Sequence, residues 1–215
     1  MKEESRLRME MTSICRRLAE KDLIAATDGN VSCRAGRDTL LVTPSGKPKG
    51  ALKPADLLLL DLQGETLSGR GKPSNEIRMH LEVYRRREDV SAVVHAHPPM
   101  LTAFTLAGIP FMADALPEVW LMFGPVPTVP YATPSTDEVP EAIAPYLEEH
   151  QAILLERHGS LTLGRSLDEA CMRLEKLEHA ARTLFFARLL RRGPLAPLPD
   201  ESLKKLEELA SRLSL

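Results

Sequence analysis

The stretch Ser91-Ala92-Val93-Val94-His95-Ala96-His97 decides how the rest of the sequence is interpreted. Its two valines are typical of a buried strand. The Pro98-Pro99 pair that follows ends the strand, because proline has no backbone N–H to donate. Residues two apart on a strand point to the same face, with their Cα atoms roughly 6.5 Å apart. We therefore expect His95 and His97 to lie together at the carboxyl end of a strand, where both imidazoles can reach one cation.

Two such histidines can also be hydrogen-bonded in a core or solvated at a sheet edge, so the pair alone does not define a metal site. A third histidine strengthens the case. His158 follows the apolar run 152–157 as His95 follows its own strand, and Gly159 lets the backbone turn closely beside it. Three histidines at two strand ends leave zinc at least one open position, which is typical of catalytic sites.

The remaining histidines differ in their surroundings. His80, His150 and His179 fall on or beside predicted helices among charged residues, and we expect them to be solvated. The three cysteines, Cys15, Cys33 and Cys171, are too widely spaced for a thiolate metal site or a disulfide framework. They fit small buried side chains in a reducing compartment.

The composition excludes several classes of protein. The chain has 215 residues, of which 43% are hydrophobic, so we expect one domain over 1–215 with a large core. Its 28 basic and 30 acidic residues are not segregated, which argues against nucleic acid or a membrane surface as the main partner. No signal peptide is visible and no apolar run approaches the ~20 residues of a membrane span, so a cytoplasmic location is expected.

Hydrophobic periodicity predicts helices interleaved with strands joined by hairpins, which favours layers of helix around a mixed sheet. The expected strands cover 31–34, 39–43, 57–61, 91–97, 151–157 and 160–164. The expected helices cover about 3–21, 74–86, 101–108, 136–147, 166–184 and 203–213. Residues 109–135 contain six prolines, so loops and short strands are predicted there.

Three polar segments could bind an anion. Ser74-Asn75-Glu76 follows a glycine-rich approach and opens a predicted helix, whose free N–H groups suit an anion. Gly29-Asn30 and Ser45-Gly46 have similar composition. Each segment could instead be a plain turn, and Glu76 alone could be explained by the positive end of the helix dipole.

Taken together, these segments resemble the class II aldolase/adducin-head family over essentially the whole chain. The six matching motifs occur in family order with family-like gaps: Gly29-Asn30-Val31-Ser32, Thr43-Pro44-Ser45-Gly46, Ser74-Asn75-Glu76, Val94-His95-Ala96-His97, Pro130-Tyr131-Ala132-Thr133 and His158-Gly159.

The resemblance implies an α/β fold, a three-layer α/β/α sandwich around a mixed, mostly antiparallel sheet, assembled as a homotetramer with active sites at subunit interfaces. It implies one Zn2+ per subunit on His95, His97 and His158, with Glu76 as a ligand in the free enzyme and as the acid/base catalyst once substrate is bound. It also implies a phosphate site formed by the residues Gly29, Asn30, Ser45, Gly46, Ser74 and Asn75.

The implied reaction is the reversible cleavage of a ketose 1-phosphate, L-fuculose 1-phosphate in particular, to glycerone phosphate and L-lactaldehyde. A metal would stabilise the enediolate left by cleavage, so no lysine Schiff base is needed. One departure concerns the aldehyde end of the substrate. The family's aldolases use a tyrosine in the loop corresponding to 109–118, where this sequence has none, and a tyrosine from a neighbour's tail, whereas no tyrosine follows Tyr146 here. Asp114 or Glu118 could substitute by position.

Three alternatives stay open. A methylthioribulose-1-phosphate dehydratase would keep the histidines and need a further carboxylate such as Glu118. A pentulose-5-phosphate 4-epimerase typically has aspartate where Glu76 stands. A non-enzymatic scaffold of the adducin-head type tends to lack the metal histidines, all of which are present here.

Overall fold

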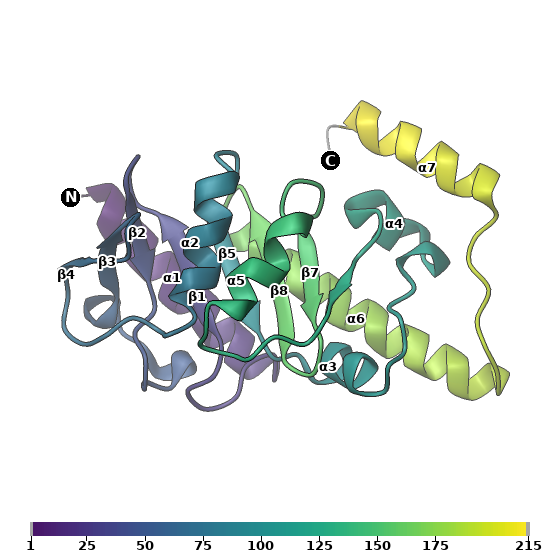
Figure 1. The fold of residues 1–215 in the computed structure, drawn as a ribbon, viewed down its shortest axis with the longest axis horizontal. Coiled ribbons are helices and arrows are strands. Elements are labelled where there is room, and N and C mark those ends of the chain that lie inside the picture. Colours follow the sequence, from purple (N-terminus) through teal and green to yellow (C-terminus); the bar gives the residue numbers. More distant parts are fainter. Residues whose placement is uncertain (1, 214–215) are drawn as a thin grey trace.

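The computed structural model describes residues 2–213, which form helices on both faces of one mixed sheet (Figure 1). The eight described strands follow the order β4-β3-β2-β1-β5-β8-β7-β6, and all neighbours are antiparallel except β6 and β7. The strands are β1 (Asn30–Arg34), β2 (Thr39–Val42), β3 (Leu58–Asp61), β4 (Thr66–Ser68), β5 (Ala92–Ala96), β6 (Thr128–Val129), β7 (Ala152–Leu155) and β8 (Gly159–Gly164). The expected α/β fold with a mixed, mostly antiparallel sheet is thus confirmed.

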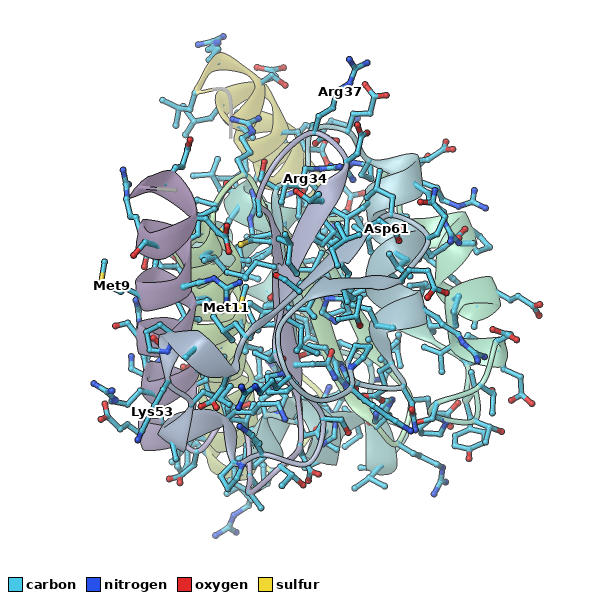
Figure 2. The ribbon with its side chains drawn as sticks, turned by 90° about the vertical axis from the view of Figure 1, so that its left-hand side faces the viewer. Met9, Met11, Arg34, Arg37, Lys53 and Asp61 are labelled. Atoms are coloured by element: carbon cyan, nitrogen blue, oxygen red, sulfur yellow. The ribbon has the colours of Figure 1, made fainter. Side chains whose placement is uncertain are left out.

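Successive side chains along each strand point to opposite faces of the sheet, so the protein has two apolar cores, one on each face. Val94 and Ala96 of β5 face the core beneath one helical layer, whereas Val93 faces the core on the opposite side. The first layer consists of α1 (Lys2–Glu20), α3 (Pro99–Leu106), α4 (Pro117–Phe123) and α6 (Leu167–Arg191), and the second of α2 (Ile77–Arg86) and α5 (Glu138–Ile143). Figure 2 shows α1 and α2 on opposite sides of the sheet, with Met11 turned inward and Met9 outward.

Residues 109–135 consist mostly of loops with the short strand β6, as expected, but helix α4 was not expected there. Pro117 occupies the first turn of this helix, where the missing N–H costs nothing because that group would have no intrahelical partner. The other five prolines lie in loops or turns, so the expectation is wrong only for residues 117–123. The final helix, α7 (Asp200–Leu213), packs against α4 and is connected to the carboxyl end of α6 by an extended linker (Figure 1). Between residues 2 and 213, no helix combines the length and apolar character needed to cross a bilayer.

The candidate site residues lie around the carboxyl end of β5, a central strand of the sheet. β5 lies between β1 and β8, with Asn30 paired to His95 on one side and Leu161 paired to His95 on the other. Helix α2 begins beside this point, and the turn from β7 to β8 carries His158. Segments distant in sequence therefore meet around the end of β5.

Candidate metal centre

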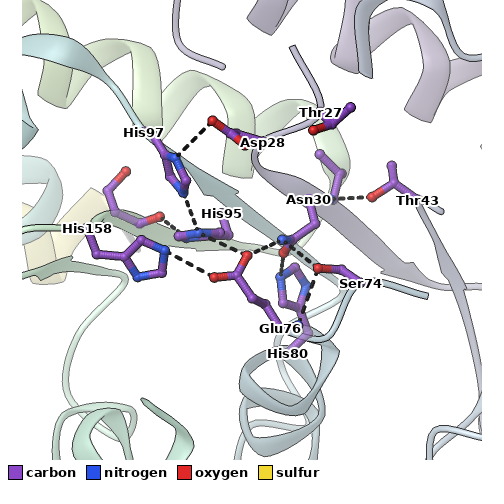
Figure 3. Close-up of polar contacts among 12 residues, drawn as sticks. Thr27, Asp28, Asn30, Thr43, Ser74, Glu76, His80, His95, His97 and His158 are labelled. Atoms are coloured by element: carbon purple, nitrogen blue, oxygen red, sulfur yellow. Dashed lines mark hydrogen bonds and ion pairs between the residues drawn. The ribbon is translucent and has the colours of Figure 1, made fainter. Parts of the chain in front are cut away.

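Three imidazoles meet at the carboxyl end of β5 (Figure 3). One ring nitrogen from each of His95, His97 and His158 lies within 4.8 Å of the others, and the ring centroids are 4.8 to 5.0 Å apart. His95 Nε2 and His97 Nε2 are separated by 3.0 Å. The sequence prediction that these three side chains converge is therefore matched by their positions.

The chemistry of this donor set fits a metal ion. His95 is fully buried, and its Nδ1 lies 3.0 Å from the carbonyl oxygen of Ser160. A carbonyl can only accept, so Nδ1 carries the proton and Nε2 presents a bare lone pair to the cluster. Burial lowers the pKa of His95 to about 3, partly offset by Glu76, so the ring is neutral near pH 7. A buried neutral ring that directs its lone pair into a cluster of further imidazoles is suited to share a divalent cation with them.

Glu76 completes the cluster from the amino-terminal end of α2. Its Oε1 lies 3.1 Å from His158 Nε2, and its Oε2 lies 3.5 Å from His95 Nε2. Although burial opposes ionisation, hydrogen bonding to His158 and Asn30 and the proximity of the imidazoles hold the pKa of Glu76 well below its usual range. The Asn30 amide adds a hydrogen bond from Nδ2 at 2.8 Å. Glu76 is thus an ionised carboxylate placed to bind a metal or to accept a proton.

Two glycines allow the backbone to approach the cluster closely. Gly29 has a φ of 70°, and a Cβ there would lie 2.7 Å from Ile24 Cγ2 and 3.0 Å from the carbonyl oxygen of His95. A Cβ at Gly159 would overlap the carbonyl oxygen of Ala96 and lie 2.9 Å from His97 Cδ2. Both positions therefore require the absence of a side chain.

The three segments predicted to bind an anion are tied together in pairs. Asn30 Nδ2 lies 3.3 Å from Ser74 Oγ, which joins the first segment to the third. Ser45 N donates to the carbonyl oxygen of Lys72 at 2.8 Å, which joins the second to the approach of the third. The buried Lys49 donates to the carbonyl oxygens of Thr27, just before the first segment, and Lys47, just after the second, at 2.7 and 3.2 Å.

Gly46 and Asn75 are exposed at this junction, as is Ser45. Asn30, in contrast, is buried; its side chain is engaged with Ser74, Glu76 and His80, and its backbone lies opposite His95 in the β1–β5 pair. The phosphate role of these residues stays a prediction.

The structure contradicts the expectation that His80 is solvated, and it does not place Asp114 or Glu118 against the histidines. His80 is buried rather than solvated, and it bonds Asn30 and Ser32. Its spacing of four residues from Glu76, on the same face of α2, was the signal that could have identified it. Asp114 lies in a short turn before α4, and Glu118 is exposed on α4. Neither forms a hydrogen bond or ion pair with the histidines within residues 2–213.

The burial of His80 makes stability depend on pH. Burial lowers its pKa from 6.5 to about 4, so between these values the unfolded chain binds a proton that the folded chain does not. Stability is therefore complete above the unfolded pKa and falls as the pH drops toward the folded value. Between about pH 7 and about pH 5, we expect the free energy of unfolding of the metal-free protein to fall by about 2 kcal/mol more than that of the metal-free His80→Gln variant. Urea unfolding measures both values. Equal losses in the two proteins would contradict this expectation.

Comparisons with known proteins agree with this geometry. A family model described as the Class II Aldolase and Adducin N-terminal domain matches residues 9–185. The chain is 35% identical over 206 residues to a 3-oxo-tetronate 4-phosphate decarboxylase of Escherichia coli (strain K12), covering 92% of this chain and 97% of that protein. It is 32% identical over 173 residues to an L-fuculose phosphate aldolase of Methanococcus maripaludis, covering 80% and 93%. The crystal structure of Escherichia coli YgbL is similar with a TM-score of 0.86 and 33% identity, covering 94% and 98%.

The chain belongs to the class II aldolase and adducin family, and it is an enzyme of the class II aldolase type. Members of this family typically depend on a metal ion, and the His95, His97 and His158 triad could hold one. The named relatives act on sugar phosphates or sugar-acid phosphates.

Proposed function

We propose that this enzyme decarboxylates 3-oxo-tetronate 4-phosphate to glycerone phosphate and carbon dioxide. The observation that carries the proposal is the acid/base content of the site. Glu76 is the carboxylate that contacts two of the three histidines, Asp28 Oδ2 lies 3.9 Å from His97 Nδ1, and no tyrosine lies in the 109–118 segment. The similarity to the Escherichia coli decarboxylase, which extends over 97% of that protein, supports the same assignment.

Decarboxylation and aldol cleavage pass through the same enediolate. In the sugar acid, the C1–C2 bond breaks, CO2 leaves, and the electron pair moves into the C2–C3 enediolate of glycerone phosphate. In a ketose 1-phosphate such as L-fuculose 1-phosphate, the C3–C4 bond breaks and leaves the same enediolate with an aldehyde. A divalent ion held by His95, His97 and His158 would supply the Lewis acid that stabilises the negative charge in either case.

The two reactions differ in the proton that the departing fragment must lose. Aldol cleavage removes the proton of the C4 hydroxyl as the aldehyde forms, which requires a base on that side of the substrate. Carbon dioxide departs from a carboxylate that is already ionised, so no such base is needed. Of the three tyrosines in this chain, Tyr84 is buried and bonded to Ser32, Tyr131 is exposed, and Tyr146 packs against the core on the α5 side of the sheet. This distribution favours decarboxylation.

Glu76 has one task in the proposed reaction. After CO2 departs, C2 of the enediolate must take up one proton to give glycerone phosphate. Glu76 acquires this proton from solvent and delivers it, since it lies nearest to the cluster. The phosphate is bound by N–H and hydroxyl donors of three segments: Gly29-Asn30, Ser45-Gly46 and Ser74-Asn75.

L-fuculose 1-phosphate aldolase activity is the second candidate, because the Methanococcus maripaludis relative is 32% identical and carries that name. In that case the missing base would come from another subunit or from water. We also propose that the ion is Zn2+, one per subunit, and that the enzyme is a homotetramer. Metal analysis and sedimentation of the purified protein test these two points.

A product assay separates the candidates. Zinc-loaded protein is incubated separately with 3-oxo-tetronate 4-phosphate, L-fuculose 1-phosphate, L-rhamnulose 1-phosphate, L-ribulose 5-phosphate and methylthioribulose 1-phosphate, and products are identified by NMR and mass. We expect CO2 and glycerone phosphate in equal amounts from the first substrate, above its spontaneous rate of decay. Lactaldehyde formed from L-fuculose 1-phosphate or L-rhamnulose 1-phosphate, without accelerated CO2 release from 3-oxo-tetronate 4-phosphate, would identify the enzyme as an aldolase instead. An epimer or a dehydrated ketone would replace it with one of the other family reactions.

A further inference from the structure

A line of polar side chains runs from Glu76 into the protein between α2 and β1 (Figure 3). Glu76, His80 and Tyr84 are spaced four residues apart, which places them on one face of the helix. Asn30 and Ser32 are spaced two apart on β1, which places them on the strand face opposite. Two regular elements thus hold five polar groups in register.

The groups form a continuous chain of hydrogen bonds. Tyr84 OH lies 2.8 Å from Ser32 Oγ, and Ser32 Oγ lies 2.6 Å from His80 Nδ1. His80 Nε2 lies 2.6 Å from Asn30 Oδ1, and Asn30 Nδ2 lies 2.8 Å from Glu76 Oε2. The two distances of 2.8 Å are ordinary, and the two bonds of the His80 ring are short.

The carboxylate of Glu76 determines which group donates and which accepts in each of these four hydrogen bonds. An ionised Glu76 can only accept, so Asn30 must turn its NH2 group toward it. The Asn30 oxygen then faces His80, whose Nε2 must therefore carry the proton. In a neutral ring this leaves Nδ1 as an acceptor for the Ser32 hydroxyl, and Ser32 in turn accepts from Tyr84. Each step follows from the one before it.

Burial makes this arrangement rigid. His80 is 1% exposed, Ser32 is 0% exposed and Tyr84 is 2% exposed, so water cannot replace a lost partner. Burial also lowers the pKa of His80 to about 4, which keeps the ring neutral and able to accept from Ser32. An unpaired polar group in such surroundings is costly, so the groups keep one another's orientation.

We propose that His80 is a positioning residue that acts through Asn30 to fix the carboxylate of Glu76. If the Asn30 amide rotated by half a turn, its oxygen would face the carboxylate and its NH2 group would face His80 Nε2–H. Both contacts would be repulsive, so the protonated Nε2 of His80 locks the amide. Glu76 Oε2 is thereby held, and Oε1 stays directed at His158 and the space between the histidines.

The chain orients the carboxylate and does not conduct protons to it. The Asn30 amide stands between His80 and Glu76, and an amide gives up a proton only by forming an unstable tautomer. The proton exchanged by Glu76 therefore comes from the solvent side. This inference rests on the acid/base role given to Glu76 in the proposed function, but it does not depend on which sugar phosphate is cleaved.

The tautomer of His80 tests the inference without any substrate. In 15N-labelled protein, with and without zinc, we expect the His80 ring to be neutral, with Nε2 protonated and Nδ1 bare. Assignment uses the His80→Gln variant, which lacks these signals. A ring protonated at Nδ1, or at both nitrogens near pH 7, would overturn the inference whether or not the proposed substrate is correct.

Two substitutions of His80 test its effect on Glu76. His80→Leu removes both ring nitrogens, whereas the amide of His80→Gln can still donate to Asn30 and accept from Ser32. With the substrate identified in the product assay, we expect kcat to fall about 10- to 100-fold in His80→Leu, with KM nearly unchanged, and to recover in His80→Gln. Leu81→Ala is the matched control, since Leu81 is buried on the same helix and forms none of the hydrogen bonds of this network. An equal loss of kcat in Leu81→Ala and His80→Leu would indicate a merely structural role.

A double-mutant cycle shows whether His80 acts through Glu76. In the Glu76→Gln background, the additional His80→Leu change should have almost no effect on kcat, because the carboxylate that it positions is already absent. An undiminished effect in that background would overturn the inference. If no substrate of the product assay is turned over, the proposed function fails, whereas the tautomer measurement still decides the role of His80.

Discussion

Glu76→Gln is expected to lower kcat by about 10²- to 10⁴-fold while the metal ion stays bound. Glutamine has nearly the same size and can still accept a hydrogen bond from Asn30, but it cannot transfer a proton to or from carbon. The three histidines are unaltered, so they continue to hold the ion. Steady-state kinetics and metal analysis of the same preparation measure the two quantities.

Glu82→Gln is the matched control for this prediction. It makes the same chemical change on the same helix, where Glu82 pairs with Arg86 at 2.5 Å instead of facing the histidines. Its turnover should equal that of the unmodified enzyme. Near-normal turnover of Glu76→Gln with the ion still bound would remove Glu76 from the catalytic role and leave it only a structural one.

Gly159→Ala is expected to impair both folding and metal binding. The new Cβ would overlap the carbonyl oxygen of Ala96 and press against His97 Cδ2, so either the β7–β8 turn or the His97 ring must move. Strain of this kind typically costs about 1–3 kcal/mol of stability. We also expect zinc affinity to fall about 10- to 100-fold, because a ligand ring or its support is displaced. Urea unfolding and competition with a zinc chelator provide the measurements.

Gly193→Ala provides the comparison for this substitution. No heavy atom lies within 4 Å of a Cβ built there, and its backbone is not in the left-handed region. Its stability and zinc affinity should match those of the original protein. If Gly159→Ala behaved in the same way as Gly193→Ala, the close approach of the turn to β5 would have no role in shaping the site.

Local sequence rules were sufficient for the elements around the histidines. Buried strands with Val93 and Val94 have few alternative conformations, and their ends follow directly from proline and glycine. Convergence of His158 with His95 was inferred from the similar position of each at a strand end. The strand order that makes them neighbours depends on pairings across the whole chain, and no local pattern encodes it.

His80 shows why other features were missed. Its neighbours in sequence, Arg78 and Glu82, are charged, which suggested a solvated position. Burial on a helix depends on the face and not on adjacent residues, and the four-residue spacing to Glu76 and Tyr84 was the better guide. Helix α4 was missed for a related reason: Pro117 was treated as a breaker, although proline is favoured in a first helical turn.

The pairing of Asn30 with His95 has a consequence for how this protein tolerates insertions and deletions. One residue gained within β1 would exchange the two faces of that strand, so that Val31 would occupy the place of Asn30 and apolar surface would meet the carboxylate. The same change in the exposed turn between β1 and β2 would leave the pairing intact. Length variation during divergence should therefore be confined to such turns, because strand alignment and reactivity are specified by the same few backbone contacts.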